Sequence, residues 1–423
     1  MDLVYIVFAV LLLAFDVWSL YSIPAVVVGV RSLLRGGRRG RESLLTGCED
    51  ELSFPFVSVV VPVKNEEKVV GRLLKALLKL DYPSSRLEVV VVNDGSCDRT
   101  GVICRGFALG FGGRLRVFDR AESSTKAAAL NFGVCQARGD IIATFDADSV
   151  PERDVVRRAV GYFSDVGVAG VQGRVCSVNS GENMLTRFLS LEGAVQYEGY
   201  IRGKDCLGLF VGLAGTCQFI RRSVLEAVGG WNERSLSEDV ELSLRLVERG
   251  YVVRYAGDVR TWEESPNSVS GLVRQRARWY RGNIGMMFRF GRLMRRFSLR
   301  RLDAEVSLLG TLLIALCVVN YFMAVWTWFL PPDLVFTWVV RLSSFFTLAV
   351  LALAGVALVF VSRPLRLRSV LWLPFIYAYW GFQSFIAFYA VLQILLRRPP
   401  NWSKTERSGV VSAEPAESIL EAS

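Results

Sequence analysis

Apolar positions follow two different patterns along the chain. Long, nearly uninterrupted apolar stretches occupy residues 4–30, 306–330, 334–361 and 370–396. Between residues 55 and 282, short β-branched runs alternate with amphipathic segments instead. A stretch of roughly 20 apolar residues is long enough to cross a bilayer, whereas alternating strands and helices are typical of an α/β domain. The pattern therefore predicts an α/β domain between an N-terminal membrane anchor and a C-terminal group of membrane segments.

The α/β domain is expected to contain a mostly parallel sheet. Strands are predicted at 57–63, 87–92, 115–118, 141–145 and 168–171. Helical patterns lie between them, at 66–80, 100–109, 125–137 and 152–163. Strands that are apolar throughout are covered by helices on both faces, which favours parallel pairing. Ligands of such sheets bind at the carboxyl ends of the strands.

Polar clusters follow three of these strands at their carboxyl ends. They are Lys64-Asn65-Glu66-Glu67, Asn93-Asp94-Gly95-Ser96 and Asp146-Ala147-Asp148. Each cluster alone is compatible with a helix cap or a turn. Three of them on one edge of a sheet indicate a binding site.

Asp146 and Asp148 flank Ala147 where the fourth predicted strand ends. If the extended backbone persists, the two carboxylates point the same way with Ala147 opposite. Mg²⁺ and Mn²⁺ prefer oxygen ligands and often keep phosphate as a further ligand. A solvated acidic loop is the alternative for an isolated pair of this kind. These residues alone leave both interpretations open.

Composition narrows the chemistry. Hydrophobic residues make up 52% of the 423-residue chain, and the mean hydropathy of +0.35 favours membrane spans. The net charge of +10 is carried mostly by arginine, clustered in 31–41 and 274–301, which indicates membrane anchoring rather than nucleic-acid binding. The chain has no histidine, so a general base must be a carboxylate, lysine, tyrosine or thiol. Its eight cysteines form no C-x-x-C pair and are expected to be reduced and buried.

The motifs and their order resemble those of family 2 inverting glycosyltransferases with the GT-A fold. The resemblance runs through residues 59–67, 91–96, 125–131 and 146–148, then Ser237-Glu238-Asp239, similar to the family's T-E-D, and Gln275-Arg276-Ala277-Arg278-Trp279, similar to its Q-x-x-R-W. It covers residues 55–282 and implies an α/β GT-A fold with a Rossmann-like sheet. It also implies a membrane synthase of the kind that makes cellulose, hyaluronan, chitin or poly-N-acetylglucosamine.

The resemblance assigns residues to the donor. Those expected to bind the nucleotide sugar, a UDP-sugar, are Pro62, Val63, Glu66, Asp94, Lys126, Asp146, Gln275 and Arg278. Asp146 and Asp148 are expected to hold Mg²⁺ or Mn²⁺ on the diphosphate. Without the family, Lys126 would be interpreted as an ordinary exposed helix lysine.

The resemblance also implies a catalytic base, Asp239, with Glu238 beside it. Ser237 precedes an amphipathic segment, so the same residues are expected to cap a helix and complement its dipole. Gly215, Cys217 and Trp279 are expected near the acceptor, with packing as the first expectation for Cys217. On a helix, Gln275, Arg278 and Trp279 share a face. The arginine can form a two-pronged hydrogen bond with a diphosphate, and the tryptophan ring can stack on a sugar. Core packing is the alternative interpretation for the tryptophan.

The membrane organisation follows from charge. Residues 1–30 are predicted to be an uncleaved anchor, 31–54 a basic cytosolic linker, 283–303 an amphipathic helix on the membrane surface, 304–396 membrane segments, and 397–423 a tail that is disordered after about 408. The positive-inside rule places the catalytic domain in the cytoplasm, on the cell membrane.

The side of the C-terminus is ambiguous. Four full crossings would leave the C-terminus outside, yet Arg397, Arg398, Lys404 and Arg407 favour the inside, as does the resemblance of 402–405 to a cytosolic tail motif of related synthases. Segment 370–396, with Pro374, is the candidate for an interrupted helix.

Three functions fit this sequence. The first is a processive, metal-dependent inverting hexosyltransferase that extends the non-reducing end of a β-linked polysaccharide and couples synthesis to export. The second adds one sugar to a membrane lipid. The third, a non-catalytic scaffold for polysaccharide export, is disfavoured because all the acidic motif positions are intact. The sequence carries no signal for the sugar, the linkage or the oligomeric state.

Overall fold

The computed structural model describes residues 3–36, 54–121, 125–291, 293, 297–326, 329, 334–361, 367–399 and 407–411. The chain divides into two compact units. The helical unit comprises residues 1–35, 194–209 and 269–404, and the sheet unit comprises 36–193, 210–268 and 405–423. The predicted linker after residue 36, the turn at 331–333, the arginines at 363 and 366, and the tail motif at 402–405 lie outside the described residues.

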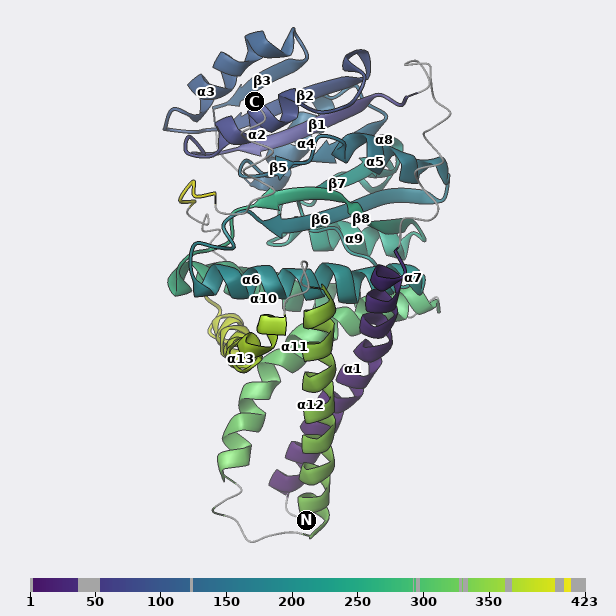
Figure 1. Ribbon diagram of the computed structural model, residues 1–423, viewed down its shortest axis with the longest axis vertical. Coiled ribbons are helices and arrows are strands. Elements are labelled where there is room, and N and C mark those ends of the chain that lie inside the picture. The colour runs from purple at the N-terminus through teal and green to yellow at the C-terminus, as the bar shows by residue number, and fades with distance from the viewer. Residues whose placement is uncertain are drawn as a thin grey trace. The chain divides into compact units, whose positions relative to one another are not determined.

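An eight-stranded mixed sheet forms the centre of the sheet unit (Figure 1). In spatial order its strands are β3 (Leu115–Arg120), β2 (Leu87–Asp94), β1 (Val57–Val63), β4 (Ile141–Thr144), β7 (Gln218–Arg221), β6 (Val168–Ser177), β8 (Val252–Glu263) and β5 (Val150–Pro151). The first four are parallel to one another, and β6 is parallel to β8. β7 is antiparallel to both its neighbours, and β5 is antiparallel to β8. The prediction of a mostly parallel α/β sheet is confirmed.

The core lies on the central strands. β1 and β2 are mostly apolar and nearly fully buried, as expected for strands with helices on both faces. Helices of this unit are α2 (Val70–Leu78), α3 (Thr100–Ala108), α4 (Lys126–Gln136), α5 (Val155–Gly161), α6 (Met184–Ala194), α8 (Arg222–Val228) and α9 (Glu238–Glu248). Gly133 of α4 packs so closely on β1 that a Cβ there would lie 2.5 Å from the Val60 side chain. This packing holds α4 against β1, and the parallel pairing of β1 with β2 and β4 places the carboxyl ends of these strands beside one another.

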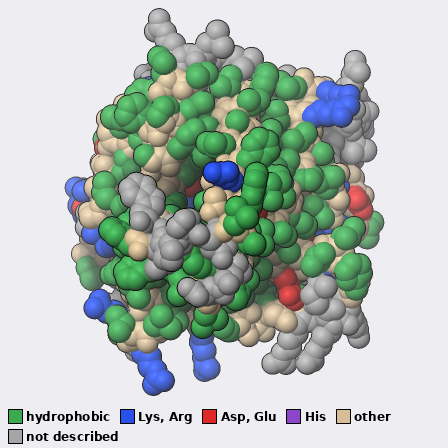
Figure 2. All heavy atoms as spheres, turned by 90° about the horizontal axis from the view of Figure 1, so that it is seen from below, with side chains coloured by type: hydrophobic (Ala, Val, Ile, Leu, Met, Phe, Trp, Pro, Cys, Tyr) green, Lys and Arg blue, Asp and Glu red, His purple; other side chains and the backbone are tan. Residues whose placement is uncertain are grey.

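Long helices make up most of the helical unit. They are α1 (Leu3–Leu34), α10 (Val269–Phe290), α11 (Leu299–Trp326), α12 (Leu334–Val361) and α13 (Leu373–Leu395), with the π-helical turn Val195–Ile201 and α7 (Arg202–Cys206). Within the described part of the chain, four helices are long and apolar enough to cross a membrane, those within Leu3–Leu34, Leu299–Trp326, Leu334–Val361 and Val370–Leu395. Seen from below, the molecule presents mostly hydrophobic side chains (Figure 2). The expectation of membrane spans at both ends of the chain agrees with this arrangement.

Two predictions about these helices need correction. The amphipathic helix expected at 283–303 begins earlier, at Val269, and ends at Phe290. A separate helix starts at Leu299 because Ser298 caps it, with its Oγ accepting the N–H of Arg301 at 3.2 Å. Pro374 does not interrupt α13 but occupies its first turn, where a missing N–H costs nothing.

The last helix runs in a different direction from the other apolar helices. Figure 1 shows α1, α11 and α12 along the length of the helical unit, whereas α13 is viewed nearly end-on. Tyr280 of α10 donates to Gln383 of α13 at 3.2 Å, and Arg281 donates to the Arg398 carbonyl at 2.6 Å. α13 therefore lies across α11 and α12 and is fastened to the amphipathic α10.

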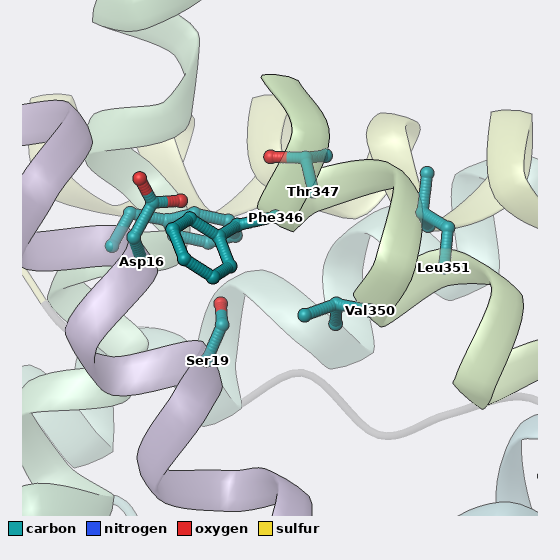
Figure 3. A pocket seen from close by; sticks show the side chains of 7 residues that line it. Asp16, Ser19, Phe346, Thr347, Val350 and Leu351 are labelled. Atoms are coloured by element: carbon teal, nitrogen blue, oxygen red, sulfur yellow. The ribbon is translucent and has the colours of Figure 1, made fainter. Parts of the chain in front are cut away.

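A small cavity of about 70 Å³ lies between α1 and α12 (Figure 3). Asp16 and Ser19 of α1 face Phe346, Thr347 and Val350 of α12 across it. Asp16 is buried. A carboxylate in an apolar helix is tolerated when it faces polar partners inside the bundle rather than lipid.

Candidate active site

The Asp146-Ala147-Asp148 motif lies in a turn after β4. The strand ends at Thr144, and the Ser149 N–H donates to the Asp146 carbonyl at 3.0 Å. The two aspartates therefore do not alternate along an extended strand as expected. Ala147 is buried, and the turn rather than the strand brings the carboxylates together.

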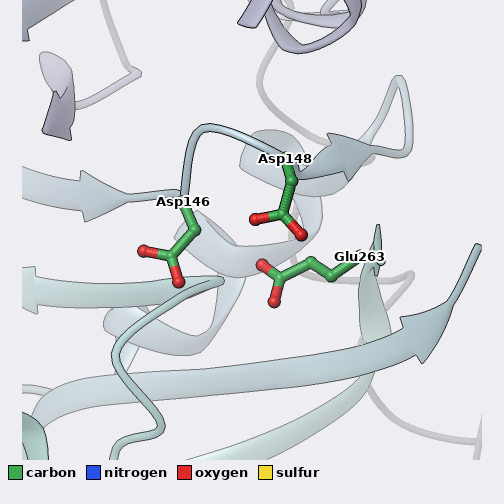
Figure 4. A group of neighbouring side chains, drawn as sticks. All are labelled: Asp146, Asp148 and Glu263. Atoms are coloured by element: carbon green, nitrogen blue, oxygen red, sulfur yellow. The ribbon is translucent and has the colours of Figure 1, made fainter. Parts of the chain in front are cut away.

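Glu263 at the end of β8 completes a group of three carboxylates, which we call the acidic triad: Asp146, Asp148 and Glu263. One oxygen from each lies within 4.8 Å of the others, and the three side chains point toward a common space (Figure 4). Burial and the charges of Asp148 and Asp146 raise the pKa of Glu263 to about 8. Three carboxylates this close repel unless a proton or a cation intervenes. An all-oxygen, multiply anionic donor set suits a hard divalent cation, so these residues fit Mg²⁺ or Mn²⁺.

Glu263 was missed by the sequence analysis. Antiparallel β7 and β5 and the parallel pair β6·β8 bring the end of β8 beside the turn after β4. Ser149 Oγ and Thr216 Oγ1 each donate to the Glu263 carboxylate at 2.5 Å, which fixes its position. The available signal was the pair Glu263-Glu264 directly after an alternating run, the same arrangement as at the ends of β1 and β2.

Lys126 is held inside the site rather than exposed on its helix. It is the first residue of α4, which Thr125 caps by accepting the Ala128 N–H at 3.2 Å. The ammonium group donates to the Asp146 carboxylate and to the Gly215 carbonyl at 3.1 Å. Burial lowers the pKa of Lys126, but the charges of Asp146 and Glu238 outweigh burial and leave that pKa above its usual value. Lys126 is therefore a permanent cation beside the acidic triad.

Asp239 and Glu238 begin α9, as the sequence predicts. Ser237 takes the N-cap position but makes no side-chain capping bond, so the expected cap is absent and Asp239 Oδ1 accepts the N–H of Val240 at 2.9 Å instead. Burial, followed by the charge of Glu238, raises the pKa of Asp239 to about 7, while Lys126 opposes the rise. A carboxyl that titrates near neutrality can take up a proton at physiological pH.

Gly215 separates Asp239 from Lys126. Its φ of +79° belongs to the left-handed region that favours glycine. A Cβ at this position would lie 3.2 Å from Asp239 Oδ2 and 3.4 Å from Lys126 Nζ. A side chain at position 215 would therefore crowd both Asp239 and Lys126.

The loops after β1 and β2 are joined by hydrogen bonds. The Glu66 N–H donates to Thr100 Oγ1 at 2.7 Å, and the Cys97 N–H donates to the Asn65 side chain at 2.8 Å. Asp94, buried at the end of β2, accepts from Arg120 at 2.9 Å. The structure thus places Glu66 and Asp94 on adjacent loops at the edge of the sheet that carries the acidic triad.

The remaining predicted positions lie in different surroundings. Pro62 and Val63 end β1, with Val63 buried. Cys217 has no exposed surface and packs among core residues with Phe219. Cys217 is therefore a packing residue, as first expected, and its full burial argues against the second expectation, a place at the acceptor.

Gln275, Arg278 and Trp279 lie on α10, in the helical unit. The helical spacing expected for them is confirmed. The Arg276 guanidinium stacks on the Trp279 ring at 4.8 Å, and 39% of Trp279 is exposed. An exposed tryptophan on a basic helix is not a core residue, so the packing alternative for Trp279 is not supported.

Comparison with known proteins identifies the class. The profile of the family described as glycosyltransferase-like family 2 matches residues 55–282. A probable glycosyltransferase, YdaM, of Bacillus subtilis (strain 168) is 36% identical over 257 residues, which cover 60% of each chain. The solved structure of the mannosyltransferase PcManGT from Pyrobaculum calidifontis, in complex with GDP-Man and Mn²⁺, aligns with a TM-score of 0.53 at 20% identity, covering 91% of this chain and 100% of that one. That likeness shows a shared GT-A-like fold.

Two further relatives act on different acceptors. The beta-monoglucosyldiacylglycerol synthase of Synechocystis sp. (strain ATCC 27184 / PCC 6803 / Kazusa) is 34% identical over 63% of this chain and 55% of its own. Glucomannan 4-beta-mannosyltransferase 7 of Arabidopsis thaliana is 30% identical over 56% of this chain and 44% of its own. The alignments thus span between 44% and 60% of the length of these curated relatives. The chain belongs to glycosyltransferase family 2.

Proposed function

We propose that this protein is a membrane-bound, metal-dependent glycosyltransferase that moves a hexose, with inversion, from a nucleotide diphosphate sugar to an acceptor hydroxyl. The arrangement of Asp239 carries the proposal. Asp239 is a carboxyl group with a pKa near 7 that lies beside the side-chain-free Gly215, and Lys126 lies between it and the acidic triad. A non-catalytic scaffold has no use for an ionisable group held in this state.

The residues divide into leaving-group and acceptor functions. Asp146, Asp148 and Glu263 would hold Mg²⁺ or Mn²⁺, which neutralises the diphosphate charge that develops as the glycosidic bond breaks. Lys126 donates to the Asp146 carboxylate and adds a positive charge where the diphosphate would bind. Glu66 and Asp94 would bind the uracil and ribose of UDP, next to Pro62 and Val63 at the end of β1.

Asp239 would act on the acceptor. It takes the proton of the acceptor hydroxyl while that oxygen bonds to the anomeric carbon, and the electron pair of the broken bond leaves with the nucleotide diphosphate. A single displacement of this kind inverts the anomeric centre. Gln275, Arg278 and Trp279 would bind the diphosphate and the acceptor sugar from α10, as their resemblance to the family motif implies.

Two acceptor classes remain, each with its own support. Beta-monoglucosyldiacylglycerol synthases at 34% identity support addition of one sugar to a lipid, and a glucomannan mannosyltransferase at 30% supports extension of a β-linked polysaccharide coupled to export. In either case the four apolar helices would hold the enzyme in the cell membrane. The sheet unit would then lie in the cytoplasm, where nucleotide sugars are made.

Product analysis tests the proposal. Purified protein is incubated with UDP-glucose, UDP-N-acetylglucosamine and GDP-mannose, with diacylglycerol or oligosaccharide acceptors, and products are sized. A polymer supports the synthase, and one sugar on the lipid supports the lipid transferase. Asp239→Asn should abolish transfer while leaving nucleotide binding nearly intact. Full activity in this variant, or no transfer from any donor, would refute the proposal.

A further inference from the structure

A short piece of the C-terminal tail, residues 407–411, lies against the end of β8. We call it the tail segment. Ser408 Oγ donates to a carboxylate oxygen of Glu264 at 2.8 Å, and the Gly409 N–H donates to the other at 3.0 Å. Arg407 also donates to the Glu264 carbonyl, and Val411 packs against the buried Val178, as does Trp262. The sequence predicts disorder from about Ser408, whereas these residues are fastened by one buried carboxylate.

This attachment places the Arg407 guanidinium beside the acidic triad. Its Nη2 lies 3.2 Å from Asp148 Oδ2, and 16% and 4% of the two side chains are exposed. Burial lowers the pKa of Arg407, but Asp148, Glu263, Asp146 and Glu66 together hold it above its usual value. Arginine stays charged at all relevant pH values, so the tail segment supplies a fixed positive charge to the triad.

A second arginine, Arg72, also lies near Asp148 but contacts a different part of it. Arg72 binds the backbone carbonyl of Asp148 at 3.2 Å and lies 3.8 Å from Glu264. It leaves the Asp148 carboxylate available. Arg407 instead contacts the carboxylate oxygen, the group that a cation needs.

We propose that Arg407 is a built-in competitor of the divalent cation, so that docking of the tail segment and cation binding weaken each other. The inference rests on the metal site of the proposed function. A guanidinium and a divalent cation that share Asp148 repel, and Arg407 lies on a segment held mainly through Glu264. The coupling is reciprocal: the docked tail lowers cation affinity, and the bound cation loosens the tail.

Binding of Mn²⁺ alone, without nucleotide, tests the inference. Free Mn²⁺ is measured by electron paramagnetic resonance with the full-length protein in detergent. Arg407→Ala is expected to bind Mn²⁺ about tenfold more tightly than the wild type. Ser408→Pro keeps the arginine but removes the hydroxyl and the N–H that reach Glu264, and should tighten binding by a smaller factor. Arg157→Ala, which removes an arginine from the exposed pair with Asp81, should change nothing.

Hydrogen exchange supplies a second measurement. Mn²⁺ should speed exchange of the Ser408 and Gly409 amides in the wild type. Unchanged or weaker Mn²⁺ binding in Arg407→Ala, or exchange that slows with Mn²⁺, would overturn the inference and indicate that Arg407 supports the loaded site. Neither readout needs a sugar donor. Failure of transfer would therefore refute the proposed function without touching this coupling, whereas a wild type that binds no Mn²⁺ would remove the basis of both.

Discussion

Lys126 and Glu238 come from distant parts of the sequence, yet the lysine Nζ lies 3.9 Å from the Glu238 carboxylate. The same ammonium group donates to Asp146 and to the Gly215 carbonyl. One cation therefore joins the turn of the acidic triad to the start of α9, where Asp239 lies. A substitution of Lys126 should therefore affect both the acidic triad and the start of α9.

Replacing Lys126 should change the pH dependence of transfer. Lys126 is among the charges that lower the pKa of Asp239, so Lys126→Met should move the midpoint of the pH profile of kcat/KM upward by about one pH unit. Maximal activity should also fall, because the leaving diphosphate loses a positive charge. Lys126→Arg keeps the charge and should keep the midpoint. An unchanged midpoint in Lys126→Met would show that the lysine does not act on Asp239.

The wild-type profile itself should report Asp239. A general base works when deprotonated, so kcat/KM should rise with pH through a midpoint near 7, the pKa of Asp239. Glu238→Gln removes a charge that raises this pKa and should lower the midpoint. A wild-type profile that is flat between pH 5.5 and 8.5 would contradict the role of Asp239.

The contribution of Asp239 to the stability of the fold should fall with rising pH, whereas its contribution to activity should rise. The folded-state pKa of Asp239 lies above that of an aspartate in an unfolded chain, so the favourable contribution of Asp239 to stability is present at low pH and is lost as pH rises through about 7. Asp239→Asn should therefore unfold at a higher temperature than the wild type at pH 8, and the difference should shrink toward pH 4. Equal differences at both pH values would contradict the raised pKa.

The first half of the sheet was predictable because its strands are local and regular. The strand β1 was predicted with its observed bounds, and β2, β3 and β6 only proved longer. β7 was missed because it is short and carries Gln218 and Arg221, and β8 because its pairing with β6 contains register shifts that disturb simple alternation. Period-two patterning fails where bulges re-aim side chains.

The site was predictable only where a motif carries its chemistry. Asp146, Asp148 and Asp239 belong to recognisable motifs. Glu263 and Arg407 do not, and sheet pairing and the tail segment bring them to Asp148 from far along the chain. The sequence also left open whether Cys217 packs in the core or lies near the acceptor, because a glycine-rich segment does not reveal which of its side chains point into the core.

Removing a triad carboxylate should weaken metal binding. Glu263→Gln keeps the shape but gives up a charged ligand, so Mn²⁺ affinity should fall roughly tenfold or more. EDTA should stop transfer by the wild type, and added Mn²⁺ should restore it. Glu152→Gln, a matched change outside the triad, should bind Mn²⁺ normally. Transfer that persists in EDTA would show that the triad holds no essential metal.

The tail segment predicts the membrane topology. Because residues 407–411 bind Glu264 of the sheet unit, we predict that they and the sheet unit lie on the same side of the membrane. The helices between them must then make an even number of crossings, which is satisfied if α11 and α12 cross and α13 lies on the surface with α10. A C-terminal epitope tag should be protected from protease in intact cells and digested in inverted vesicles. Digestion in intact cells would contradict this topology.

Gly215→Ala should impair transfer more than the strain of its backbone explains. The new methyl group would lie 3.2 Å from Asp239 Oδ2, where the acceptor hydroxyl would approach if Asp239 is the base, and the φ of +79° disfavours any side chain. Gly250→Ala is the matched control, because its φ is +85° and nothing lies within 4 Å of the new Cβ. The free energy of unfolding should fall by a similar amount in both variants, about 1 kcal/mol. Only Gly215→Ala should lose transfer, by about tenfold or more in kcat/KM. Equal loss of transfer in the two variants would mean that the position in front of Asp239 has no special role.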